Sequence, residues 1–285
     1  MQTRILAAFV FVPVILVTIF FLPAWVFGLL IGLICAISAG EFFSAVMPRR
    51  NVRALWYCRA SAFSIPLLFG LSDGFSIIAL FAAVALLIAL FAEAIFGYDT
   101  DGALPISQVM LSFFAGAIIP LCLGTLVLLR AIPEGLPLGG LGDHFGGQVY
   151  VLIPIAIAFV SDAGGYLGGQ LCGKRKLIER VSPKKTIEGA IGAFIATLLI
   201  MLAFSTIMYF SMDTRFSLVS IIVYGLVGSA ITQLGDLAFS VVKRECAVKD
   251  FGTLIPGHGG ILDRFDSMIM LAPVVFALVM YMPIF

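Results

Sequence analysis

The chain has 285 residues, of which 61% are hydrophobic and only 12% are charged, and its mean hydropathy is +1.14. Soluble domains keep apolar residues near half of their composition, so these values exclude an ordinary soluble globular protein. The formal net charge of +1 gives no indication of nucleic-acid binding. The five cysteines are widely separated and form no C-x-x-C pair, which argues against a zinc site or a disulfide framework.

Apolar runs long enough to cross a hydrocarbon core, about 20 residues each, are spread along the whole chain. Because no water inside the bilayer can satisfy backbone polar groups, such runs are expected to be helical. We predict an all-α polytopic membrane protein with about nine transmembrane helices, near residues 5–22, 25–47, 60–71, 75–96, 106–129, 149–172, 188–211, 217–242 and 265–285. The first is interpreted as a retained helix rather than a cleaved signal. The third is short and contains Pro66, so a re-entrant or tilted segment is the alternative.

The basic residues predict the orientation of these helices. With nine spans, all of the 17 lysines and arginines except Arg130 and Arg215 fall on one side of the membrane. Cytoplasmic loops carry the excess of basic residues, so we expect this side and the N-terminus to be cytoplasmic. We divide the chain into residues 1–145, an N-terminal membrane region with about five spans for a lipid groove or oligomer contacts, and residues 146–285, a catalytic membrane region with about four spans and two basic cytoplasmic loops.

Several carboxylates lie within or near the predicted spans, where an ionisable group costs at least ~2.5 kcal/mol. Glu93 is close to a helix end, which favours a solvated terminus, whereas for Glu41 a structural and a functional role are both open. Asp162 and Asp236 have neighbouring glycines that permit close approach of a helix or ligand. Asp236 also shares one helical stripe with Ser240 and Lys243, at i, i+4 and i+7. A buried ion pair between helices is the structural alternative.

The loop before the last predicted span combines acidic, basic and glycine residues. Asp263 and Asp266 lie on one face if the helix begins near Ile261. Carboxylate oxygens suit Mg²⁺, which also takes water and phosphate oxygens. Backbone amides around the glycines can wrap an anion, and nearby cations add positive charge. The residues predicted to form this nucleotide-phosphate site are Lys243, Arg244, Lys249, Gly257, His258, Gly259, Gly260, Asp263, Arg264 and Asp266.

A second basic loop runs from residue 173 to residue 189. Ser182 followed by Pro183 predicts a helix N-cap and first helical position, which places Lys184 and Lys185 in an N-terminal turn that favours anions. A topology signal or contact with anionic lipid explains the same basic residues equally well.

The stretch from Ser240 to Asp266 resembles the signature of the phosphatidate cytidylyltransferase family: S-x-x-K-R, four residues, K-D, then G, I-P, H-G-G and D-R-x-D. The segments SDAGGY (161–166) and SPKKTIEG (182–189) are similar to two upstream segments of that family, apart from Gly165, where Ala is expected. The N-terminal half agrees only in having several spans.

This resemblance implies transfer of CMP from CTP to phosphatidic acid, with Mg²⁺ required, in a bacterial inner membrane. A second cation and a homodimer are left open. It implies Asp236 and Asp263 as metal ligands, Asp266 and Asp162 as additional ligands, and Lys243 and Arg264 as catalytic cations. It assigns substrate binding to Ser182, Lys184, Lys185, Thr186, Ser240, Arg244, Lys249, His258, Gly259 and Gly260. For His258, a hydrogen bond to a phosphate and a structural role in the glycine loop are both open. The alternatives are a cytidylyltransferase acting on another lipid phosphate and an ion-coupled transporter.

Overall fold

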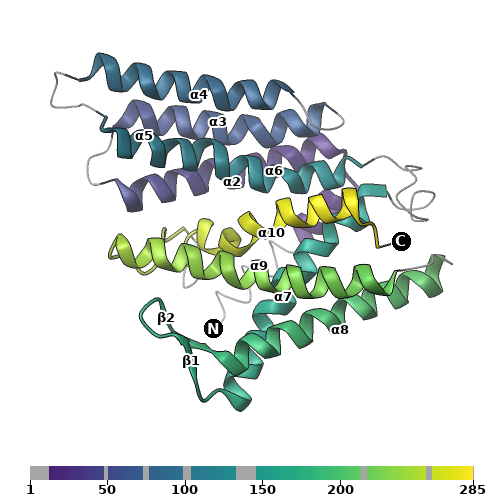
Figure 1. Ribbon diagram of the computed structural model, residues 1–285. Helices are drawn as coiled ribbons and strands as arrows, with labels where there is room; N and C mark the ends of the chain where they lie inside the picture. Colours follow the sequence, from purple (N-terminus) through teal and green to yellow (C-terminus); the bar gives the residue numbers. More distant parts are fainter. Residues whose placement is uncertain are drawn as a thin grey trace. The chain divides into compact units, whose positions relative to one another are not determined.

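The structure is a computed structural model that describes residues 13–47, 51–72, 77–98, 104–132, 146–212, 217–254 and 259–284. Within these ranges it is all-α apart from one two-stranded hairpin, as predicted (Figure 1). The elements are α2 (Ala24–Val46), α3 (Val52–Leu71), α4 (Ile77–Phe96), α5 (Ile106–Phe113), the π-helical turn η1 (Phe114–Ile118), α6 (Ile119–Arg130), α7 (Gly146–Cys172), β1 (Lys176–Ile178), β2 (Ser182–Thr186), α8 (Ile187–Met212), α9 (Leu218–Glu245) and α10 (Leu262–Tyr281).

Eight helical segments in the described ranges are long and apolar enough to cross a membrane, with α5, η1 and α6 counting as one. The predicted first span, residues 5–22, falls partly outside the described residues, and residues 13–20 are helical. The protein is therefore an integral membrane protein of several spans.

The doubtful third segment is a helix of 20 residues that qualifies as a candidate span. It begins at Val52 because the side chain of Asn51 accepts hydrogen bonds from the backbone N–H groups of Arg53 (3.1 Å) and Ala54 (3.2 Å). The predicted start at residue 60 was wrong because Arg53 and Arg59 were assigned to a loop. The guanidinium of Arg59 instead lies 5.7 Å from the ring centroid of Trp56, one turn earlier on the helix.

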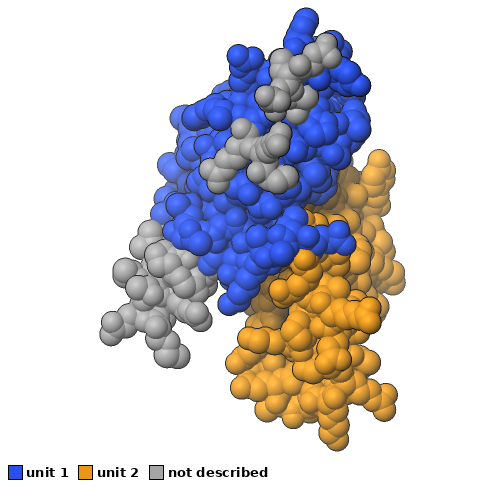
Figure 2. Space-filling model, turned by 90° about the vertical axis from the view of Figure 1, so that its left-hand side faces the viewer, with its two compact units in different colours: residues 1–131, 245–265 blue, residues 132–244, 266–285 orange. Residues whose placement is uncertain are grey.

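The chain forms two compact units, coloured separately in Figure 2. Unit 1 comprises residues 1–131 and 245–265, so the segment after α9 groups with the N-terminal helices. Here α3 lies beside α2, α4 and α6 (Figure 1). An added Cβ at Gly32 would lie 2.6 Å from the carbonyl oxygen of Phe63, so glycine allows α2 and α3 to approach closely. The predicted functional division at residue 145 stays a prediction.

Unit 2 comprises residues 132–244 and 266–285. Helices α7 and α9 meet where the hydroxyls of Ser161 and Ser229 lie 3.3 Å apart, and the amide of Gln233 on α9 donates to the carbonyl of Ala190 on α8 at 3.4 Å. Just before α9, the N–H of Ser217 donates to the carbonyl of Ile284, which follows α10, at 2.8 Å. Hydrogen bonds thus join α9 to α7 and α8, and join the start of α9 to the residues after α10.

The second basic loop is a β-hairpin rather than the start of a helix, so the N-cap assignment of Ser182 and the helical placement of Lys184 and Lys185 were wrong. Strands β1 and β2 are antiparallel, with Lys176 opposite Thr186. Proline has no N–H to donate, and both an edge strand and the first position of a helix accept a residue without one. The Ser-Pro sequence therefore does not distinguish a helix start from a strand. Helix α8 begins only after Thr186, whose hydroxyl accepts from the N–H of Gly189 at 3.1 Å.

We predict that Gly164→Ala destabilises the bundle by about 1–3 kcal/mol, because overpacking forces backbones apart. Its Cβ would lie 2.4 Å from the Cβ of Ala196 and 2.9 Å from the carbonyl oxygen of Gly192. Thermal unfolding in detergent measures the effect.

Gly165→Ala on the same helix is the matched control. Its Cβ would meet nothing closer than 3.7 Å, an ordinary contact, and the helix gains about 0.5–1 kcal/mol from replacing glycine. Equal melting temperatures for the two variants would contradict the close packing of α7 on α8.

Candidate active site

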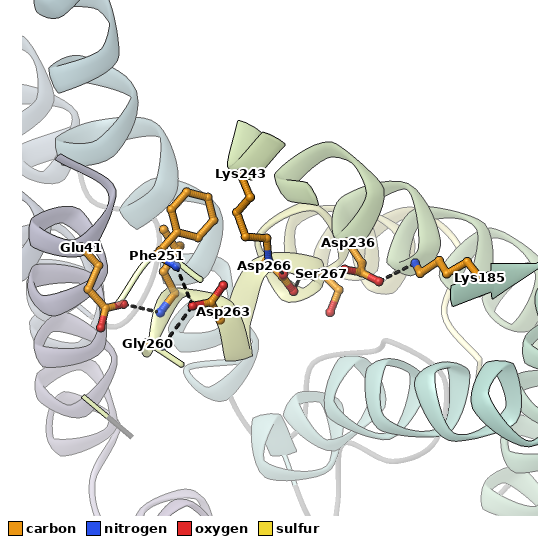
Figure 3. A network of polar contacts seen from close by, with 10 residues as sticks. Glu41, Lys185, Asp236, Lys243, Phe251, Gly260, Asp263, Asp266 and Ser267 are labelled. Carbon is orange, nitrogen blue, oxygen red and sulfur yellow. Dashed lines mark hydrogen bonds and ion pairs between the residues drawn. The ribbon is translucent and has the colours of Figure 1, made fainter. Parts of the chain in front are cut away.

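Asp236 lies on α9 and forms an ion pair with Lys185 on β2 (Figure 3). The two side chains are 29% and 27% exposed, so the pair is partly shielded from water. The hairpin thus brings Lys185, from the second basic loop, into contact with Asp236, the metal ligand predicted in the eighth span. The alternative of a buried ion pair between helices does not describe Asp236, because its partner comes from a strand.

Asp266 lies in the second turn of α10 and is held by Lys243 of α9. The Lys243 ammonium lies 3.4 Å from one carboxylate oxygen, and the N–H of Ser267 donates to the other at 2.7 Å. Both side chains are about 90% buried, at 12% exposed for Lys243 and 11% for Asp266. This is a buried ion pair between two apolar helices.

The two ion pairs are brought near each other by a glycine. An added Cβ at Gly235 would lie 3.0 Å from the Cα of Ser267 and 3.3 Å from the carbonyl oxygen of Asp266, so the backbones of α9 and α10 touch there. Asp236 is the residue after Gly235 on α9, and Asp266 is one of the two α10 residues at this contact, so the two carboxylates lie near each other (Figure 3). Two carboxylates and two lysines therefore form one cluster in unit 2.

Asp263, in the first turn of α10, has a different environment within unit 1. One of its oxygens accepts hydrogen bonds from the N–H groups of Phe251 (2.9 Å) and Gly260 (3.0 Å). Gly259 has a φ of +85°, a conformation that favours glycine, and an added Cβ would lie 2.9 Å from the same carboxylate oxygen. Asp263 thus joins the backbone at Phe251 to the backbone at Gly260, one of the glycines that the sequence singled out.

Glu41 and Glu93 are both partnered in unit 1. The two oxygens of Glu41 accept from the N–H groups of Ile261 (3.1 Å) and Leu262 (2.8 Å), at the start of α10. Glu93, at the end of α4, lies 3.7 Å from a guanidinium nitrogen of Arg53 and accepts from Asn51 at 3.4 Å.

The other predicted residues are distributed more widely. Ser240 lies on α9 one turn after Asp236, and Arg244 donates from Nε to the carbonyl oxygen of Val181 at 3.2 Å, which ties the hairpin to the end of α9. Exposed positions are occupied by Asp162, Lys184, Lys249 and Arg264. His258 and Gly257 lie outside the described residues.

No group of three or more potential metal-binding side chains comes together within the described residues. Mg²⁺ needs no such group, because it is bound through one or two carboxylates together with substrate phosphates and water. Asp236 and Asp266 fit that requirement. Burial and the adjacent charge of Glu245 raise the pKa of the thiol of Cys246, which follows α9.

Sequence reasoning missed one structural carboxylate, Glu188, and named a second, Glu41, without identifying its partners. Glu188, in the first turn of α8, accepts from the N–H groups of Lys174 (3.0 Å) and Arg175 (3.2 Å) and so holds the entry of the hairpin. An acidic residue at a helix start was a usable signal for it. The partners of Glu41 carried no signal, because they lie 220 and 221 residues away.

Fold and site together define an integral membrane protein in which two carboxylates on apolar helices are paired with lysines, one from a helix and one from a hairpin. The chain belongs to the Cytidylyltransferase family, whose sequence model matches residues 2–282. Among curated proteins, it is similar to phosphatidate cytidylyltransferases of Staphylococcus haemolyticus (40% identical over 136 residues, 48% of this chain and 51% of the relative) and Staphylococcus aureus (43% over 127 residues, 45% and 47%). It is also similar to the uncharacterized protein YnbB of Escherichia coli (39% over 136 residues, 48% and 44%). The chain spans about half the length of the curated relatives it matches.

We predict that the Lys243–Asp266 pair has a coupling free energy of about 1.5–3 kcal/mol, because the pair is buried and one hydrogen bond joins two charged groups. A double-mutant cycle with Lys243→Met and Asp266→Asn, read by unfolding in detergent, measures it.

The Arg53–Glu93 pair provides the control cycle. Its arginine side chain is 77% exposed and its atoms are 3.7 Å apart, so we expect coupling of about 0–1 kcal/mol. Coupling at Lys243–Asp266 no larger than at Arg53–Glu93 would overturn the assignment of a buried pair.

Proposed function

We propose that this protein transfers CMP from CTP to phosphatidic acid, forming CDP-diacylglycerol and pyrophosphate. The observation that carries this proposal is the cluster of Asp236 and Asp266, each paired with a lysine, on α9 and α10. The signature-like stretch from Ser240 to Asp266 begins in α9 and ends in α10. Membership of the Cytidylyltransferase family and the names of the staphylococcal relatives support it.

CMP transfer requires the protein to align the two reacting phosphates and to neutralise their negative charge. An oxygen of the lipid phosphate attacks the α-phosphorus of CTP, the new P–O bond forms, and the bond from the α-phosphorus to the bridging oxygen breaks with release of pyrophosphate. The attacking oxygen is already anionic, so no general base is required. Catalysis of phosphoryl transfer is largely positioning and electrostatic stabilisation of the charge on the transferring group.

The lysines of the cluster suit the negative charge of the substrates. Lys185 and Lys243 are each held by a carboxylate, which keeps an ammonium group in place within an apolar bundle. Lys184, Lys249 and Arg264 are exposed and are proposed to contact the triphosphate or the lipid phosphate. The hairpin contributes Ser182 and Thr186 on the same strand as Lys184.

Asp236 and Asp266 would hold Mg²⁺, which supplies charge neutralisation at the phosphates when bound. Each carboxylate has a lysine partner that a divalent cation would replace or join. For Asp162 and Asp263 a role as metal ligand stays a prediction. Since CTP is a cytoplasmic substrate, the proposed orientation places the N-terminus and both basic loops on the cytoplasmic face of a bacterial inner membrane.

We expect the purified protein to convert labelled CTP and phosphatidic acid into a labelled lipid and pyrophosphate. Asp236→Asn should lower turnover by about 100-fold or more, because the carboxylate that holds Lys185 and would hold Mg²⁺ is lost. Glu179→Gln, which removes an exposed carboxylate from the hairpin turn of the same unit, should leave turnover within about twofold.

If the protein forms no lipid product with phosphatidic acid but forms one with another lipid phosphate, the proposed acceptor is wrong and that lipid is the substrate. Full activity in Asp236→Asn would refute the role of the cluster.

Removal of divalent cations by EDTA should abolish turnover, and added Mg²⁺ should restore it. Asp266→Asn should raise the Mg²⁺ concentration for half-maximal activity by about 10-fold or more, because one of two carboxylate ligands is lost. A Mg²⁺ titration of turnover for wild type, Asp266→Asn and Glu179→Gln measures this. An unchanged Mg²⁺ requirement in Asp266→Asn would exclude Asp266 as a ligand.

A further inference from the structure

We propose that Glu41, on α2, is a positioning residue that holds the segment formed by the described residues 251–254 and 259–262 in the conformation required for CMP transfer. This inference rests on the proposed function. It gives the N-terminal helices a part in the reaction besides contact with lipid, since Glu41 and this segment belong to the same compact unit.

The first observation is the pair of hydrogen bonds at the start of α10. The first N–H groups of a helix have no partner inside the helix, and an anion is the preferred partner because the helix dipole places positive charge there. Glu41 places one oxygen 3.1 Å from the nitrogen of Ile261 and the other 2.8 Å from the nitrogen of Leu262. A carboxylate from another helix therefore caps α10 with both oxygens.

The second observation is the shape of the segment around this carboxylate. An added Cβ at Gly252 would lie 2.3 Å from one oxygen of Glu41, and an added Cβ at Gly260 would lie 2.3 Å from the other. No side chain fits at either position while Glu41 keeps its place. Next to Glu41, the ring of Phe42 lies 6.0 Å from the ring of Phe251, which is 5% exposed. The segment thus packs closely against α2, because Gly252 and Gly260 have no side chains and Phe251 contacts Phe42.

The third observation links Glu41 to Asp263. Gly260 donates its N–H to Asp263, and Phe251 donates to the same oxygen, so the segment is held by Asp263 from one direction and by Glu41 from the other. Loss of either carboxylate leaves backbone N–H groups without a partner and removes a restraint on the segment.

These contacts also limit where a phosphate can bind. The N–H groups of Ile261 and Leu262 already donate to Glu41, so these two groups are not available to bind the triphosphate. Glu41 itself would repel a phosphate. Its contribution to the reaction is therefore to fix the segment and Asp263, not to touch the substrate.

The test compares Glu41→Gln, Glu41→Asp and Gly252→Ala with Glu93→Gln, a matched control that removes a partnered carboxylate from α4 of the same unit. We expect Glu41→Gln to lower kcat by roughly 10- to 100-fold with a smaller change in the KM for CTP, because displaced reacting groups cost rate. Glu41→Asp keeps both acceptor oxygens and should recover part of kcat. Gly252→Ala should reproduce the loss from the opposite side of the contact, and Glu93→Gln should leave kcat within about twofold.

Hydrogen exchange provides a readout that does not depend on activity. In Glu41→Gln the amides of Ile261 and Leu262 should exchange at least about 10-fold faster than in wild type, while amides of α3 and α4 keep their rates. If wild type makes no lipid product but this local acceleration appears, the proposed function fails while the anchoring by Glu41 stands.

Three results would overturn the inference. They are unchanged exchange at Ile261 and Leu262, a kcat in Glu41→Gln equal to that of Glu93→Gln, and faster exchange throughout unit 1 in Glu41→Gln and Gly252→Ala alike. The last result would show general destabilisation instead of local positioning.

Discussion

A carboxylate within a bundle of apolar helices is stable only when a cation or several N–H groups surround it, because the surroundings do not solvate its charge. The structure meets this requirement in two ways. Asp236 and Asp266 are paired with Lys185 and Lys243, whereas Glu41 and Asp263 accept backbone N–H groups. The lysine pairs place cations beside carboxylates, an arrangement that suits the binding of phosphates. The hydrogen bonds to Glu41 and Asp263 hold the backbone at the start of α10.

Glycines lie where the charged groups approach the backbone or one another, because a larger residue would block the contact. At Gly235 the backbones of α9 and α10 touch, and at Gly252 and Gly260 the backbone comes against the carboxylate of Glu41. A side chain at any of these positions would separate the groups by the width of a methyl group or more. Since electrostatic and hydrogen-bond contacts weaken steeply over that distance, close backbone packing and the charged contacts depend on each other.

Much of the fold was predictable because a span needs a long apolar run whatever its neighbours are. Predicted bounds for α2, α4, α7, α8 and α9 agree with the structure to within three residues at each end. The hairpin at Ser182–Thr186 was not predicted, because Ser-Pro suits a helix start and a strand edge alike and only its pairing with β1 decides between them. For α3, basic residues near the helix start were mistaken for a loop.

The sequence by itself determined that this protein is an all-α membrane protein of the Cytidylyltransferase family, because hydropathy and the residues from Ser240 to Asp266 are local properties of the chain. Only the tertiary structure decided which partner each charge has. Lys185 meets Asp236 through a hairpin, and Glu41 caps a helix that begins 221 residues later. No local rule specifies such pairs, because they depend on how helices distant in the chain pack against one another.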